Sequence, residues 1–114
     1  MAIVEPDELK RLLLRWQGGE LSAGQVHELA EAMLAAREWQ EFPRSDLRSI
    51  PYEVLGQLDI LNQQLIIRED VPAMLSFLET QDPETAWLEW ESYWRNVDYD
   101  QRKMILKGNG DYAV

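Results

Sequence analysis

The sequence predicts an all-α fold, an irregular bundle of five or six short helices with no sheet. Apolar side chains recur at the helical spacing i, i+3, i+4 and i+7 in successive segments of the chain. A proline or an N-capping side chain precedes each of these segments, as at a helix start. No run of four or more residues alternates apolar and polar side chains in the way of a half-buried strand. We expect the 114 residues to form a single helical domain, 1–114.

Two helices are expected in the first forty residues. The first begins near Pro6, because the missing N–H of proline has no partner at the first helical position, and it stops at Gly18-Gly19. Ser22 and Gln25 make a capping box for the second helix, which should run to about Trp39. Their inward stripes are Leu9, Leu12, Leu13 and Trp16, then Val26, Leu29, Ala30, Met33 and Leu34.

Further helices are expected after a loop at residues 41–50. Pro51 begins a third helix, whose stripe continues to Leu65. Asp70 is expected to cap a fourth helix and Asp82 a fifth, each with a proline in the first turn. Asp98 is expected to cap a last short helix that ends before residues 108–110.

Negative charge is concentrated in the second half of the chain. Residues 51–100 carry eleven acidic side chains and two basic ones, Arg68 and Arg95, which gives −9 of the net charge of −10. A folded surface with such a charge repels itself, so it typically serves solubility or the binding of a basic partner. The same charge argues against nucleic acid as a partner, because phosphates would be repelled.

Composition excludes several other classes of protein. Cysteine is absent, which excludes disulfides, thiolate metal sites and cysteine nucleophiles. The longest aliphatic runs, at 12–14 and 65–67, are far shorter than the ~20 residues of a membrane span. The first residues contain no apolar run typical of a signal peptide. We therefore expect a cytoplasmic protein of bacterial type that does not associate with membranes.

No set of residues in the sequence suggests catalysis. His27 is the only histidine, and with Glu28 and Glu31 it forms half of a zinc-binding helix motif, but no second His or Cys completes the site. A diiron site would need a glutamate at position 24, which is Gly24. We expect no enzyme activity, no cofactor and no metal. A metal-dependent enzyme that uses His27, Glu28 and Glu31 is the weakest alternative.

The tryptophan stripe of the fifth helix has two interpretations. Trp87, Trp90 and Trp94 share one helical face, and this periodicity favours packing in the core. Tryptophan, tyrosine and arginine also dominate protein–protein hot spots, and a tryptophan is large enough to pack on one edge and be exposed on the other. The predicted partner-binding residues are Glu79, Asp82, Glu84, Glu89, Trp90, Glu91, Tyr93 and Trp94.

Several motifs together suggest a family. They are Leu12-Leu13 through Trp16, Gly19-Glu20-Leu21-Ser22-Ala23, Val26 with Ala30-Glu31, Val54-Leu55, Leu58-Asp59, and Asp70-Val71-Pro72 before Leu75 and Leu78. In these motifs, over residues 7–80, the chain resembles the small helical immunity proteins of bacterial bacteriocin and toxin systems, of the colicin D type. Residues 81–114 then form a Trp-rich helical extension.

The resemblance implies an all-α protein without catalysis of its own. Such proteins bind a cognate nuclease toxin and cover its basic cleft with carboxylates that take the place of substrate phosphates. Our first hypothesis is therefore an acidic immunity protein that binds and neutralises a basic protein partner. The second is a structural or adaptor module that forms a homodimer through the Trp-rich C-terminal segment. Salt should weaken the first association and leave the second unchanged.

Overall fold

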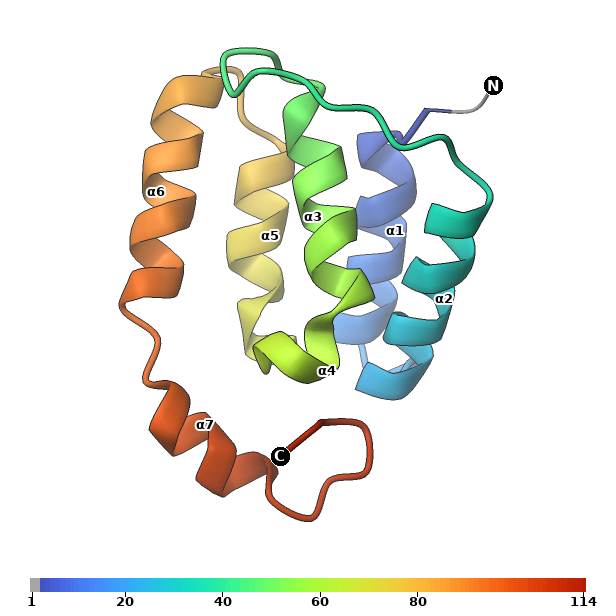
Figure 1. The fold of residues 1–114 in the computed structure, drawn as a ribbon, viewed down its shortest axis with the longest axis vertical. Helices are drawn as coiled ribbons and strands as arrows, with labels where there is room; N and C mark the ends of the chain where they lie inside the picture. The colour runs from blue at the N-terminus through green and yellow to red at the C-terminus, as the bar shows by residue number, and fades with distance from the viewer. Residues whose placement is uncertain (1–2) are drawn as a thin grey trace.

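The computed structural model describes residues 3–114 and confirms the all-α prediction (Figure 1). Within that range it contains seven α-helices, one short 3-10 turn and no strand. The elements are α1 (Pro6–Gln17), α2 (Ala23–Ala35), α3 (Ser49–Asp59), α4 (Leu61–Gln64), η1 (Arg68–Asp70), α5 (Val71–Leu78), α6 (Pro83–Arg95) and α7 (Tyr99–Leu106). None of the helices in this part of the chain combines the length and apolarity needed to cross a lipid bilayer.

Helices α1, α2, α3 and α5 lie side by side and enclose the core (Figure 1). Side chains from each of these helices are fully buried in it; they include Leu9, Leu13, Trp16, Val26, Leu55, Leu58 and Met74. Helix α6 packs on the outer side of α5, at the edge of the bundle. Helix α7 lies at the foot of the molecule, and the last residues return beneath α4.

Three of the six predicted helix starts are confirmed by side-chain capping contacts. Ser22 and Gln25 form the reciprocal capping box of α2, with N–O distances of 2.9 and 3.2 Å. Asp82 accepts from the backbone N–H of Thr85 at the start of α6, and Asp98 caps α7 in the same way. These contacts are local in sequence, which is why the residue pattern alone reveals them.

Two helix ends differ from the prediction. Helix α2 stops at Ala35, so residues 36–48 form one long loop before α3. The expected third helix breaks at Ile60, and Leu65 ends α4 in the left-handed conformation, with φ at 54°. After this reversal the chain buries both Leu65 and Ile66, which lie beyond the end of α4.

Two of the three stripe tryptophans lie in the core, as the periodicity favours. Trp87 and Trp90 are 8% and 5% exposed. Phe77 of α5 stacks on Trp90 with ring centroids 4.3 Å apart and meets Trp87 edge to face at 5.2 Å. The indole N–H of Trp87 donates to the Ser49 hydroxyl at 3.0 Å. These contacts dock α6 on α5 and α3, and they leave Trp94 half-buried at the edge.

Candidate protein-interaction site

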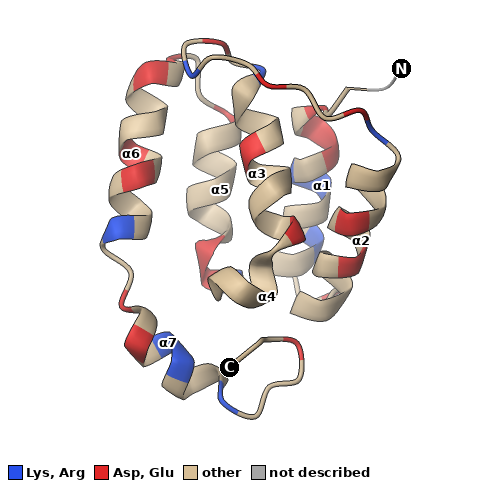
Figure 2. Cartoon of the chain, in the orientation of Figure 1, with Lys and Arg blue, Asp and Glu red and all other residues tan. Residues whose placement is uncertain are grey.

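The acidic residues predicted to bind a partner lie at the end of α5, in the α5–α6 turn and along α6. Glu79, Asp82, Glu84 and Glu89 are exposed, and Glu91 is half-buried. Figure 2 shows acidic positions near the top and the middle of α6, at the edge of the bundle. The structure therefore presents most of the predicted carboxylates to solvent on one outer helix and the turn before it.

Most carboxylates of the acidic stretch have no basic neighbour. The described part of the chain holds five ion pairs, which are Glu8–Arg37, Glu20–Arg15, Glu91–Arg44, Asp46–Arg48 and Asp70–Arg102. Of the eleven acidic residues in 51–100, only Asp70 and Glu91 are among them, so nine have no ion-pair partner among residues 3–114. Charge that is not neutralised within the molecule projects a field into solvent.

Acidic side chains are not confined to α6. Figure 2 shows them also on α1, α2 and α3, and Glu28 and Glu31 of α2 are exposed. The charge alone therefore does not single out one face. What distinguishes the α6 side is an aromatic groove next to the carboxylates.

This groove, of about 470 Å³, lies between α3, α4 and α6. Four aromatic rings line it, those of Trp87, Trp90, Trp94 and Tyr99. Glu53 of α3 and Glu91 of α6 contribute carboxylates to its wall. Arg44 and Arg95 also line the groove and balance these two carboxylates, so it is the aromatic faces that favour a cationic guest, through the ring quadrupole.

The predicted aromatic contact residues have unequal access to solvent. Trp90 packs in the core, whereas Tyr93 and Trp94 are half-buried. Trp94 meets Trp90 edge to face at 5.3 Å and Tyr93 at 4.9 Å. Trp90 therefore acts on this surface mainly by holding Trp94 in place.

Sequence reasoning missed the residues that complete the groove. Arg44 comes from the loop at 36–48, Glu53 from α3 and Tyr99 from α7. The guanidinium carbon of Arg44 lies 4.4 Å from the centroid of the Trp87 ring, and the same group pairs with Glu91. No local pattern marks these residues, because they meet only through the tertiary fold.

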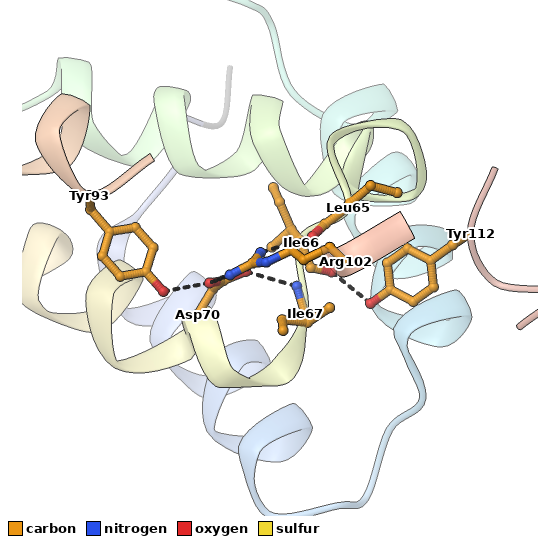
Figure 3. Close-up of polar contacts among 7 residues, drawn as sticks. All are labelled: Leu65, Ile66, Ile67, Asp70, Tyr93, Arg102 and Tyr112. Carbon is orange, nitrogen blue, oxygen red and sulfur yellow. Dashed lines mark hydrogen bonds and ion pairs between the residues drawn. The ribbon is translucent and has the colours of Figure 1, made fainter. Parts of the chain in front are cut away.

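A second cluster surrounds Asp70, which is fully buried (Figure 3). Its oxygens accept from the Tyr93 hydroxyl at 2.5 Å, from two Arg102 nitrogens at 2.6 and 2.7 Å, and from the Ile67 N–H at 2.9 Å. A carboxylate offers about four acceptor positions, and all are filled. Asp70 therefore has no free acceptor site for acid–base work, and its side chain does not cap α5 as the sequence suggested.

The Asp70 cluster fastens the C-terminal segment to the bundle. Arg102 also donates to the Leu65 carbonyl at 2.9 Å, and the Tyr112 hydroxyl donates to the Ile66 carbonyl at 2.6 Å (Figure 3). Burial, with the hydrogen bond to Asp70, raises the pKa of Tyr93 to about 12. Burial lowers the pKa of Arg102, but its contacts with Asp70 raise it more, so the net shift is upward. Both groups keep their neutral-pH charge state, which preserves the cluster.

His27 takes a structural contact. Its Nε2 lies 2.7 Å from the backbone carbonyl of Asp59, which ties α2 to the end of α3 and leaves the ring only partly exposed. Among residues 3–114, no three His, Cys, Asp or Glu side chains converge as a metal site requires. Gly24, noted above as a missing ligand, admits the C-terminal loop: a Cβ there would lie 2.5 Å from the Asp111 carboxylate.

Comparison with known proteins identifies no relative of this chain. No family model, no curated protein sequence and no solved structure matches it. The resemblance to colicin D-type immunity proteins therefore stays a prediction from the motifs in residues 7–80.

Proposed function

We propose that this protein is a non-catalytic inhibitor that binds a basic protein partner and neutralises it, and that the partner is the nuclease domain of a bacterial toxin. The observation that carries the proposal is the set of nine carboxylates in residues 51–100 that have no ion-pair partner among residues 3–114; one of them, Glu53, lines the aromatic groove. In this proposal it acts in the bacterial cytoplasm, as an immunity protein would.

A nuclease is the basic partner that best fits this charge. A nuclease cleft attracts phosphates, so it must carry basic side chains. Carboxylates held on a rigid helix can occupy that cleft in place of phosphates, and the exposed ones on α6 include Glu84 and Glu89. The net charge of −10 would also speed the encounter with a positively charged protein.

The first test reverses exposed charge on α6. Once affinity capture and mass spectrometry identify the basic partner, stopped-flow mixing measures the association rate at low salt. Glu84→Lys/Glu89→Lys should lower that rate at least about tenfold, because both the steering field and the contact face change sign locally. Both side chains are exposed, so the variant should fold.

The matched control is Glu28→Lys/Glu31→Lys, which changes the net charge equally on exposed positions of α2. This control should slow association by less than about threefold, through net charge alone. Equal effects of the two double variants would mean that α6 is not the contact face. Failure of the wild-type protein to inhibit the captured basic partner would contradict the proposal itself.

Self-association is a second candidate function, supported by exposed apolar side chains. The Trp-rich segment exposes three apolar side chains, with Leu88 69%, Met104 78% and Ile105 68% exposed. A homodimer built on them would persist at high salt, because apolar contacts are not screened. Sedimentation of the purified protein at low and high salt separates this adaptor-like role from charge-driven binding of a basic partner.

A further inference from the structure

We infer that the α6 groove binds an arginine side chain of the basic partner, and that Arg44 holds that position in the free protein. The inference rests on the proposed function for the source of the arginine. It names a particular guest, a guanidinium group on a protein chain, and a particular place for it, the face of Trp87.

The first observation is that two hollows adjoin at Arg44. The groove of about 470 Å³ described above shares Arg44, Glu53 and Trp87 with a neighbouring hollow of about 240 Å³. The smaller one adds the rings of Trp39, Phe42 and Tyr52 and the carboxylate of Glu41. Movement of the Arg44 side chain would join the two into one aromatic channel.

The second observation is that a guanidinium group already lies between the two hollows. Arg44 stacks over Trp87 at 4.4 Å while pairing with Glu91, and so combines a cation–π contact with an ion pair. A planar guanidinium is the cation best able to do both at once, since it stacks flat and donates in its own plane. The contacts of Arg44 therefore show which group the site recognises.

The third observation is charge complementarity. Without Arg44, the walls of the joined channel carry three carboxylates, Glu41, Glu53 and Glu91, against one remaining cation, Arg95. This excess favours a basic guest over a neutral or acidic one. A partner arginine would restore the balance that Arg44 provides in the free protein.

The fourth observation is that Arg44 is weakly held. Its side chain is 61% exposed, and it extends from a loop without helix or strand. Exposed ion pairs and cation–π contacts are individually weak, so exchange of one arginine for another is feasible. The incoming side chain would keep the contacts with Trp87 and Glu91 and free the loop arginine to solvent.

The test uses Nα-acetyl-arginine amide as the probe and follows the indole N–H signals in an NMR titration. Its neutral isostere, Nα-acetyl-citrulline amide, is the matched control ligand. The Arg44→Ala variant should bind the arginine probe at least about threefold more tightly than the wild type, because the internal competitor is gone. Arg44→Ala/Glu91→Gln should lose that gain, and the citrulline probe should give no saturable shift in any variant.

Glu28→Gln in the Arg44→Ala background is the control variant, since Glu28 is exposed on α2 and lines neither hollow. It should leave the affinity for arginine unchanged. If Arg44→Ala binds the probe no more tightly, or if Glu28→Gln weakens binding as much as Glu91→Gln, the inference is wrong. If the arginine titration fails while Glu84→Lys/Glu89→Lys slows association with the partner as expected, only the inference about the groove is wrong. Saturable arginine binding by a protein that captures no basic partner would overturn the proposed function alone.

Discussion

Asp70 joins three parts of the chain that lie far apart in the sequence. It contacts Tyr93 on α6 and Arg102 on α7, while its own turn supplies the Ile67 N–H. Taking a carboxylate out of water is costly unless its partners replace the lost solvation. Here four hydrogen-bond donors replace the lost solvation of the carboxylate. We therefore expect Asp70 to stabilise the fold and to tolerate little substitution.

Removal of this charge should destabilise the protein strongly. Asp70→Asn leaves the guanidinium of Arg102, 13% exposed, without its counter-ion and places an amide NH₂ against other donors. Breaking a buried pair on one side typically costs about 3–5 kcal/mol. Urea unfolding followed by circular dichroism measures the loss. Asp100→Asn, in the first turn of α7 and without an ion pair among residues 3–114, should cost less than about 1 kcal/mol. Similar losses in the two variants would show that the Asp70 network contributes little.

The same cluster predicts a loss of stability in alkali. The Tyr93 phenol has an ordinary pKa of 10.0 in the unfolded chain and a pKa of about 12 in the folded protein, so the folded state keeps its proton to higher pH. The stabilisation is complete below pH 10 and is lost as the pH rises from about 10 to about 12. The unfolding free energy should fall in that window, and less steeply in Tyr93→Phe. Some fall should persist in the variant, because burial also raises the pKa of Tyr99 and Tyr112. Parallel curves for wild type and variant would exclude Tyr93 as a source.

At the scale of the elements, capped helix starts and the ends marked by glycine could be predicted, whereas the ends of α2 and α3 could not. Capping contacts span three residues, so Ser22, Asp82 and Asp98 reveal where helices begin. The end of α2 depends on distant packing: Trp39, expected in the helix, lies beyond it and contacts Tyr52 of α3, as does Phe42 of the same loop, with ring centroids 5.3 and 5.7 Å away. Apolar spacing within one segment contains no information about such a partner.

The candidate site shows the same division. Exposure of Glu79, Glu84 and Glu89 follows from their positions between the apolar residues of the sequence, and the structure agrees. The groove beside them could not be predicted, because Arg44 and Tyr99 reach it from segments far apart along the chain. Trp90, predicted as a contact residue, is buried by Phe77, whose position on α5 the stripe of α6 does not specify.

Helix α7 and the tail should depend on a few anchors. Of residues 99–114, only Leu106 and Tyr112 are buried. Tyr112→Phe removes the bond to the Ile66 carbonyl, which leaves a buried acceptor unpaired at about 1–3 kcal/mol. Amide hydrogen exchange across residues 99–112 should accelerate about tenfold or more, with α1 to α3 unchanged. Tyr99→Phe is the control, because the Tyr99 hydroxyl makes no hydrogen bond within the described residues. Equal acceleration in the two variants would contradict the anchoring role.

At the scale of the whole molecule, size and screening decide how the charges act together. The principal extents are 38 × 30 × 23 Å. The Debye length is about 30 Å at 0.01 M salt and about 8 Å at 0.15 M. At low salt, carboxylates on opposite sides of the bundle therefore repel one another, whereas at physiological salt only neighbours do. At low salt, therefore, the net charge of −10 both destabilises the free protein most and attracts a basic partner most strongly.

This coupling predicts opposite responses to salt. Between about 0.01 and 0.15 M NaCl, the melting temperature of the free protein should rise, because screening relieves self-repulsion, while association with the basic partner slows. Glu84→Gln/Glu89→Gln lowers the net charge to −8 (−10 + 2), so both responses should shrink in it. Differential scanning calorimetry and stopped-flow mixing in the same buffers measure the two. A melting temperature independent of salt would mean that the carboxylates are too dispersed to act as one field. The fast encounter on which the inhibitor proposal relies would then have no physical source.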